Sequence, residues 1–284
     1  MDDLLATATR ERLVDRLDDL VLENRFTIAV VFPVTGALLL TLSAVNPTWL
    51  PDALVFHPLL ILVGTLVMRL PLVAGLAPLV DRRAALSLAL LTVYAYAIEF
   101  VGLSTGWPYG EFAYGVSLGP MLAGEVPLGL PIFFVPLVVN SYLLCTLLLG
   151  DRAASAWVRV PAVIATVLAV DLVLDPGAVA LGFWEYGGGG PYYGVPVSNY
   201  EGWVLSATVA VLALDWGFDW TALVERLRAC VFMLDDMVSF VILWGAINAY
   251  FGNWIPVAVA ALFGLGLVAT DRFDVPTQPR WMGE

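Results

Sequence analysis

The 284-residue sequence contains no lysine, and all 13 of its basic residues are arginine. A retinal Schiff base, a pyridoxal-phosphate site and a Walker A phosphate loop each require the lysine amine, so these classes of protein are excluded. Metal-binding residues are also scarce: His57 is the single histidine, and Cys145 and Cys230 are the two cysteines. This set is too small for a zinc site or an iron–sulfur cluster. Both cysteines lie in apolar runs, which favours two core residues over a disulfide.

Charge is scarce as well. Charged residues make up 13% of the chain, and the net charge is −12. The basic surface that binds nucleic acid is therefore missing. Apolar residues reach 60%, against about 45–50% in a soluble domain. A soluble fold of this size could not bury so much apolar surface, so the composition predicts an integral membrane protein. The acidic, lysine-free composition is typical of proteins from a salt-loaded cytoplasm and suggests an extreme halophile.

Eight apolar stretches of about 20 residues predict an all-α, polytopic membrane helical bundle. They cover residues 26–45, 54–70, 86–103, 128–149, 160–180, 203–220, 231–250 and 255–270. Residues 1–25 are polar, with Arg and Asp at helical spacing, and predict an amphipathic segment on the cytoplasmic surface. We therefore expect one transmembrane domain over residues 26–270, followed by a cytoplasmic tail, 271–284.

The arginines predict the orientation of this bundle. All 13 lie before the first stretch, after the last, or near the connections between stretches two and three, four and five, and six and seven. The opposite loops, 46–53, 104–127, 181–202 and 251–254, contain none. By the positive-inside rule, the arginine side is cytoplasmic. Both termini are then cytoplasmic, in a multi-pass protein of the cell membrane.

Carboxyl groups inside the predicted spans are the strongest functional signal. Glu99 lies near the outer end of the third span, and Asp171 and Asp175 lie one helical turn apart in the fifth. A charged group at that depth is costly and usually functional. The structural alternative is a hydrogen-bonded polar pair that holds helices together. Asp215, Asp235 and Asp236 lie near inner ends beside Arg226 and Arg228, so we expect them to be ion-paired or solvated.

The two long loops without arginine, 104–127 and 181–202, are rich in Gly, Pro, Trp and Tyr. An aromatic belt at the membrane interface is one explanation. However, Glu99 and Asp175 are each followed seven residues later by a glycine and then by an aromatic cluster, GWPYG or GFWEYG. This internal echo suggests two parallel repeats about an axis along the membrane normal. We then expect both acids and both clusters to face one cavity near the outer leaflet.

The residues available in such a cavity suit proton-initiated chemistry on an alkene. A carboxyl group in an apolar setting favours its neutral form and can act as a general acid. Aromatic faces stabilise a nearby cation by about 0.5–2 kcal/mol each. Together they suit protonation of a double bond in a membrane-dissolved isoprenoid, followed by attack of water or loss of a proton.

Three stretches carry a resemblance to a known family. They are EFVGLSTGWPYGEFAYG (99–115), VPLGLPIFFVPLVVNSY (126–142) and DPGAVALGFWEYGGGGPYYGVPVSNYEGW (175–203). Over roughly residues 86–220 the chain resembles the carotenoid-biosynthesis membrane family that includes the CruF-type carotenoid hydratases. In haloarchaea, members of that family hydrate bisanhydrobacterioruberin to bacterioruberin. The resemblance implies a hydro-lyase without a cofactor or metal, which adds water to the terminal C=C bonds of an acyclic carotenoid. Its partners would be the carotenoid, the lipid bilayer and other enzymes of the pathway.

The residue roles come from the chemistry of the side chains, because the resemblance implies little about individual catalytic residues. We expect Glu99 or Asp175, held neutral, to protonate the alkene, and water to be oriented by an amide, a phenol or a second carboxylate. The candidate catalytic residues are Glu99, Asp175, Asp171 and Glu111. The candidate substrate-binding residues are Trp107, Tyr109, Asn140, Trp184, Tyr186, Tyr192, Tyr193, Asn199 and Trp203.

Three alternatives stay open at this point. An intramembrane prenyltransferase such as a lycopene elongase has aspartate boxes that Asp171-x-x-x-Asp175 and Asp235-Asp236 superficially resemble. However, a prenyl diphosphate needs Mg²⁺ and basic residues, and the side bearing Asp175 contains no arginine. An isoprenoid isomerase or cyclase would use the same cation and quench it differently. A proton-coupled transporter or a carotenoid-binding scaffold would also contain intramembrane acids.

Overall fold

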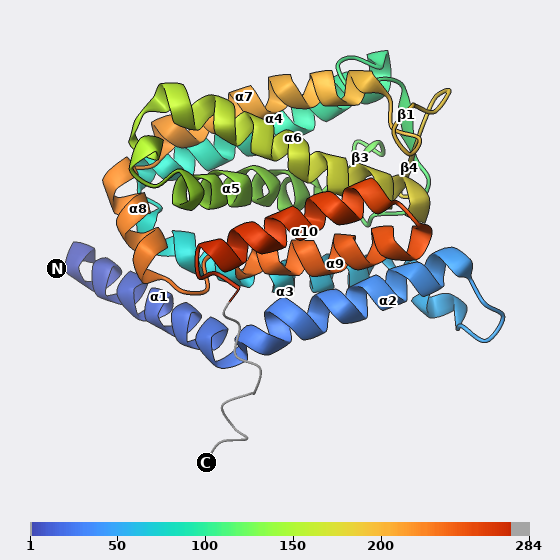
Figure 1. Ribbon diagram of the computed structural model, residues 1–284. Coiled ribbons are helices and arrows are strands. Elements are labelled where there is room, and N and C mark those ends of the chain that lie inside the picture. The colour runs from blue at the N-terminus through green and yellow to red at the C-terminus, as the bar shows by residue number, and fades with distance from the viewer. Residues whose placement is uncertain (1, 274–284) are drawn as a thin grey trace.

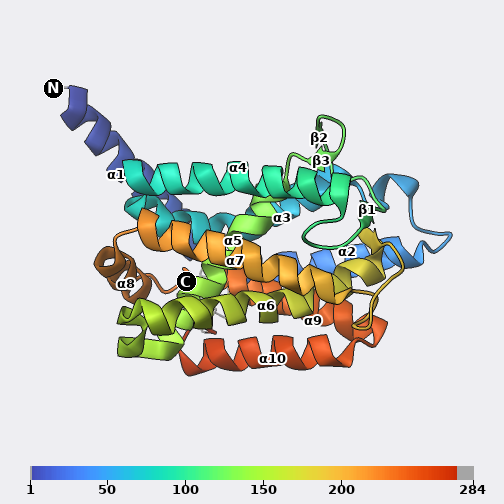
Figure 2. The same ribbon diagram turned by 90° about the horizontal axis from the view of Figure 1, so that it is seen from above.

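The computed structural model describes residues 2–273, with side chains from residue 10 onward, and it is predominantly helical. Its long helices run roughly side by side in one bundle (Figures 1 and 2). Part of the predicted tail, residues 274–284, lies outside the described residues. The helices are α1 (Asp2–Phe26), α2 (Phe32–Val45), α3 (Pro58–Leu76), α4 (Arg82–Thr105), α5 (Leu130–Leu149), α6 (Ala156–Leu181), α7 (Val197–Gly217), α8 (Trp220–Ala229), α9 (Asp235–Phe251) and α10 (Trp254–Ala269).

Six helical segments within the described residues are long and apolar enough to cross a membrane. They are Arg10–Val45, Asp52–Leu79, Arg82–Thr105, Leu130–Ala154, Ala156–Leu181 and Val197–Gly217. The last two predicted spans correspond to the shorter helices α9 and α10. The chain is therefore a polytopic helical membrane protein, as its composition predicts.

The first predicted span is a continuation of the N-terminal helix. Residues Thr27–Val31 form a short π-helix, η1, between α1 and α2, and Pro33 follows it within α2. A π-helical turn and a proline both bend a helix, and α1 meets α2 at an angle in Figure 1. The polar helix α1 thus leaves the direction of the bundle at the point where the apolar sequence begins.

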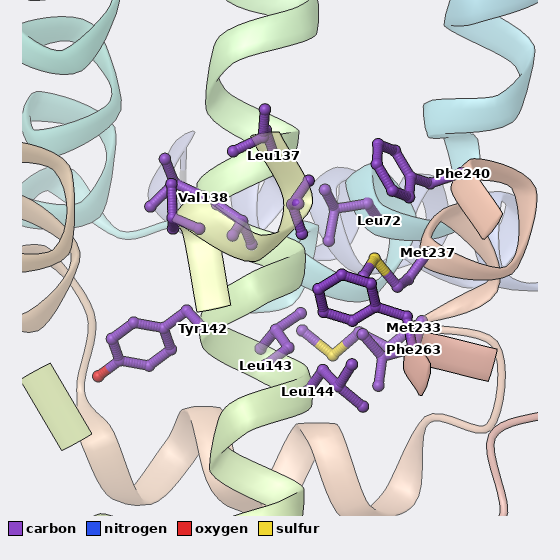
Figure 3. Packing of buried hydrophobic residues seen from close by; sticks show 14 of the residues in the cluster. Leu72, Leu137, Val138, Tyr142, Leu143, Leu144, Met233, Met237, Phe240 and Phe263 are labelled. Atoms are coloured by element: carbon purple, nitrogen blue, oxygen red, sulfur yellow. The ribbon is translucent and has the colours of Figure 1, made fainter. Parts of the chain in front are cut away.

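Helix α5 passes through the centre of the bundle, and 12 of its 20 residues are buried. Figure 3 shows Leu137, Leu143 and Leu144 of α5 close to Leu72 of α3, Met237 of α9 and Phe263 of α10. Apolar contact between a central helix and its neighbours is the packing expected where lipid already surrounds the outer faces. The helices around α5 accordingly expose many apolar side chains, such as Leu90, Leu212 and Leu265.

The loops predicted between helices contain short strands, which the sequence did not predict. Strand β1 (Phe112–Tyr114) pairs antiparallel with β4 (Trp184–Tyr186), and β2 (Met121–Leu122) pairs with β3 (Val126–Pro127). The β1–β4 pair joins the two aromatic loops that follow Glu99 and Asp175. Figure 1 shows these strands at the end of the bundle opposite α8.

The arginines that the structure describes gather toward the α8 end. They lie in α1, in the second half of α3, at the starts of α4 and α6, in the 3₁₀ segment η4 (Gly150–Ala154), in α8 and after α10. Asp215, Asp235 and Asp236 are ion-paired, as expected, but their partners in the described chain are not Arg226 and Arg228, because helix packing brings arginines from other segments to them. Asp235 binds Arg25 at 2.7 Å, Asp236 binds Arg69, and Asp215 binds Arg159 at 2.7 Å. The bundle therefore has an arginine end and an aromatic, strand-bearing end.

Candidate active site

A cavity of about 140 Å³ lies beneath the paired loops at the aromatic end. Half of its 20 lining residues are aromatic, and Glu99, Asp175 and Asn199 contribute its carboxyl and amide groups. Its volume is close to that of an engineered apolar cavity that binds benzene, about 150 Å³. The cavity thus has room for the end of an isoprenoid chain, but not for a whole carotenoid.

Glu99 and Asp175 line this same cavity from two different helices, α4 and α6. The helices place both carboxyls in their C-terminal parts, seven residues before the glycine C-caps at Gly106 and Gly182. Each of these glycines has a φ of +73° and ends its helix in the left-handed region that favours glycine. The chain then turns back across the cavity, and its aromatic loop reaches the carboxyl that precedes it.

Each of the two carboxyls accepts a hydrogen bond from a tyrosine of the paired strands. Tyr114 of β1 donates to Glu99 Oε1, and Tyr186 of β4 donates to Asp175 Oδ2 at 2.9 Å. Burial, and then the neighbouring carboxylate, raises the pKa of both Tyr114 and Tyr186. Both phenols therefore stay protonated near neutrality and act as donors.

Asn199 links the two aspartates of α6. Its side-chain nitrogen donates to Asp175 Oδ2 at 2.5 Å and to Asp171 Oδ2 at 2.9 Å. Asp171 is fully buried behind the cavity, and its Oδ1 has no hydrogen-bond partner among the described residues. Asn199 reaches this position because α7 begins at Val197, earlier than the predicted span. The amide thereby holds Asp175 at the cavity wall and connects it to a second acid.

Aromatic side chains form most of the remaining wall. Trp203 stacks on Phe134 with ring centroids 5.6 Å apart, and Tyr109 lies 6.2 Å from the ring of Trp203. The Tyr109 hydroxyl is bound to Ser206 at 2.6 Å, so its ring is fixed in place. Trp184 also lines the cavity, and its indole nitrogen is buried without a protein partner in the described chain. These faces surround the space between the two carboxyls.

Several predicted site residues lie elsewhere. Glu111 and Trp107 are exposed and line a separate, more open pocket with Ser198 and Glu201. Asn140 donates to Asp236 at 2.7 Å, in the buried cluster that contains Arg69. The sequence expectation that these three residues reach one cavity with Glu99 therefore does not match their positions. The directions in which Glu111 and Asn140 point depend on loop and helix packing, which spacing alone does not reveal.

Tyr192 and Tyr193 also lie outside the lining of the cavity. The Tyr192 hydroxyl donates to the Leu172 carbonyl at 3.1 Å, and burial raises the pKa of Tyr192 to about 12. The Tyr193 hydroxyl accepts from the backbone of Ile255 at 3.3 Å. These two tyrosines fasten the 181–202 loop to α6 and α10.

Aromatic lining residues that were not among the predicted site residues include Tyr114, Phe134 and Trp244. Tyr114 belongs to the first aromatic loop, but it lies 15 residues after Glu99, whereas Tyr186 lies 11 residues after Asp175. The internal echo matched Tyr109 with Tyr186, so it gave no signal for Tyr114. Phe134 and Trp244 lie within apolar spans, where no local pattern separates a cavity-facing ring from a core ring.

The fold and the cavity define a class of protein: a polytopic helical membrane protein with carboxyl groups in a small aromatic pocket. Comparison with known proteins agrees with this class. The sequence profile of a family described as carotenoid biosynthesis protein matches residues 56–267. A bisanhydrobacterioruberin hydratase of Haloarcula japonica is 62% identical over 266 residues, which cover 94% of this chain and 90% of that protein. No solved structure matches the chain. The chain belongs to the carotenoid biosynthesis protein family.

Proposed function

We propose that this protein is a carotenoid hydratase that adds water to the terminal C=C bonds of bisanhydrobacterioruberin and forms bacterioruberin. The observation that carries the proposal is the 62% identity, over 94% of the chain, to a relative with that name. The cavity supplies a suitable site, because an acyclic carotenoid ends in an apolar alkene that fits an aromatic pocket.

The proposed reaction is the addition of water by acid catalysis. Glu99 or Asp175, in its neutral form, protonates the alkene carbon that bears a hydrogen. The positive charge develops on the neighbouring tertiary carbon, where the faces of Tyr109, Trp184 and Trp203 stabilise it. Water then attacks that carbon and loses a proton, which gives a tertiary alcohol. The overall reaction is redox-neutral and consumes only the alkene and water.

We further propose that the bundle spans the cell membrane eight times, with both termini in the cytoplasm. Helices α9 and α10 complete the six longer spans, and the described arginines gather toward one end. The positive-inside rule then places the cavity near the outer leaflet. The substrate, dissolved in the bilayer, would insert one end into the cavity while the rest of its chain stays among lipid. Enzymes that supply this carotenoid would work in the same membrane.

The test is expression in a host that accumulates bisanhydrobacterioruberin, with pigments analysed by mass spectrometry. We expect product masses higher by one or two water molecules than in the same host with an empty vector. Unchanged mass with altered absorption would instead indicate an isomerase or a cyclase. Unchanged pigment, with the protein present in the membrane fraction, would contradict the proposed function.

A further inference from the structure

The two carboxyl groups in the cavity differ in their hydrogen bonds. Asp175 Oδ2 accepts two, from Tyr186 at 2.9 Å and from Asn199 at 2.5 Å. Among the described residues, Glu99 accepts one, from Tyr114. Each donated hydrogen bond stabilises the ionised form of a carboxyl group relative to the neutral form. Asp175 is therefore the better stabilised anion of the two.

The surroundings of the cavity restrict the number of negative charges. Asp171 and Asp175 both lie within 2.9 Å of the Asn199 nitrogen, and Glu99 lines the same cavity. Among residues 10–273, the other titratable groups that face this cluster are phenols: Tyr109, Tyr114, Tyr186 and Tyr200. The ion pairs described above engage Arg25, Arg69 and Arg159 with other aspartates. Neighbouring carboxyl groups do not readily ionise together in an apolar interior. The state in which one carboxyl group of this cluster is ionised and the others are neutral is therefore favoured.

From this asymmetry we propose that Glu99 is the proton donor of the hydration and that Asp175 is the carboxylate base. The assignment rests on the proposed hydratase function. The π-electron pair of the alkene forms a C–H bond with the Glu99 proton, and Glu99 is left as a carboxylate. A water oxygen forms the C–O bond with the resulting cation, and the proton that it releases passes to Asp175. A proton then returns from Asp175 to Glu99 through water, which restores the starting state.

Asp171 has a different part in this assignment. It does not line the cavity, and the one side-chain hydrogen bond that it makes within the described chain comes from Asn199. It is therefore a positioning residue, which holds the amide that binds Asp175. The Asn199 nitrogen has two hydrogens, and the two aspartates use one each.

The experiment separates the acid step from the base step by isotope exchange in D₂O. Membranes with the wild-type protein, Glu99→Gln or Asp175→Asn are incubated with bisanhydrobacterioruberin, and both product and recovered substrate are analysed by mass spectrometry. We expect hydration to fall by at least about 100-fold in both variants, the typical loss for a general acid or base. Asp175→Asn retains the acid, so its cation forms and reverts by losing a proton. Recovered substrate from this variant gains deuterium, whereas substrate from Glu99→Gln gains none.

Controls keep the outcomes distinct. Glu185→Gln removes an exposed carboxyl next to Tyr186 and should leave hydration at the wild-type rate. If Glu99→Gln does not accumulate in the membrane, Glu99→Asp retains a carboxyl, and we expect it to hydrate slowly and still exchange deuterium. Deuterium exchange in Glu99→Gln but not in Asp175→Asn would reverse the assignment and overturn the proposal, as would wild-type hydration by either variant. Absence of hydration by the wild-type protein would instead contradict the proposed function itself.

Discussion

At the scale of single residues, the site consists of carboxyl groups held by donors from another segment of the chain. Tyr186 comes from β4, and Asn199 from the first turn of α7, yet both reach one oxygen of Asp175 in α6. Hydrogen bonds to a charged group contribute about 1.5–3 kcal/mol each. Removing one donor should therefore change the rate of the chemical step more than the affinity for an apolar substrate.

Tyr186→Phe tests this expectation. The variant keeps the ring that lines the cavity and removes the hydrogen bond to Asp175. We expect kcat to fall by roughly 10- to 150-fold, since about 1.4 kcal/mol corresponds to tenfold in rate, while KM changes by less than about threefold. Tyr250→Phe, which alters a 59% exposed tyrosine on α9, is the matched control. A Tyr186→Phe enzyme with wild-type kcat would contradict the role of this phenol.

Gly202→Ala tests how closely the cavity wall is packed. A Cβ atom at Gly202 in α7 would lie 2.4 Å from the Tyr109 ring, which must then move. We expect loss of most hydration activity and lower thermal stability in detergent. Gly64→Ala in α3 is the control, because a Cβ there meets nothing within 4 Å. Alanine also stabilises a helix by about 1 kcal/mol relative to glycine, so the control should be as stable as the wild type or slightly more stable. Equal behaviour of the two variants would contradict this packing.

At the scale of secondary-structure elements, buried ion pairs fix α9 against its neighbours. Asp235 pairs with Arg25 at the end of α1, and Asp236 pairs with Arg69 of α3, with both aspartates fully buried. Asn140 of α5 donates to Asp236 and brings a third helix into the second cluster. The first turn of α9 therefore connects helices that are far apart in the sequence.

Asp236→Asn should weaken these contacts between α9 and its neighbouring helices. The variant preserves the shape of the side chain but leaves the Arg69 guanidinium without its counter-charge, and breaking a buried pair typically costs about 3–5 kcal/mol. We expect a clearly lower Tm in detergent, measured by the loss of monodisperse protein on heating. Asp151→Asn is the control, because Asp151 lies 4.0 Å from Arg228 on the exposed surface. A Tm for Asp236→Asn equal to that of the control would show that the buried pair does not stabilise the bundle.

The pairing of the two short strands β1 and β4 also joins segments that are distant in the sequence, in this case at the active site. They connect loops that begin 76 residues apart, at Gly106 and Gly182, and bring Tyr114 and Tyr186 over the same cavity. Gly115 lies against the Gly182 carbonyl so closely that a Cβ would approach it to 2.3 Å. The sequence echo suggested a shared cavity, and the lining confirms it for Glu99, Asp175, Tyr109, Trp184 and Tyr186.

At the scale of the whole molecule, the described arginines and the cavity lie toward opposite ends of the bundle. Figure 1 shows α8 at one end of the bundle and strands β1 and β4 at the other. The described arginines gather toward the α8 end, and the cavity lies at the strand-bearing end. Under the proposed orientation, the loops over the cavity face the outside of the cell and α8 faces the cytoplasm. An apolar substrate can then react at one membrane surface without meeting the charged residues at the other.

Cysteine labelling in intact cells tests this orientation. Glu185→Cys on β4 should react with a membrane-impermeant maleimide, whereas Asp151→Cys should react only after the cells are permeabilised. The native thiols should not interfere, since Cys145 and Cys230 are 5% and 4% exposed. Burial also raises the pKa of Cys230 to about 11, so its thiol stays protonated and unreactive. Labelling of Asp151→Cys in intact cells would contradict the proposed orientation.

The sequence by itself determined the class of protein, the approximate positions of the helices and the acids worth testing. These properties depend on local composition, because a membrane-spanning helix must satisfy its own backbone hydrogen bonds and present apolar side chains to lipid. A carboxyl group within such a helix is visible in the sequence as an exception to that composition.

Only the tertiary structure decided which of these residues meet. It places Glu99 and Asp175 in one cavity, adds Tyr114, Phe134 and Trp244, and leaves Glu111, Trp107 and Asn140 outside it. The physical reason is that the rotation of each helix about its axis depends on packing against helices distant in the sequence. The hydropathy pattern cannot reveal this rotation, because lipid and the protein core are almost equally apolar.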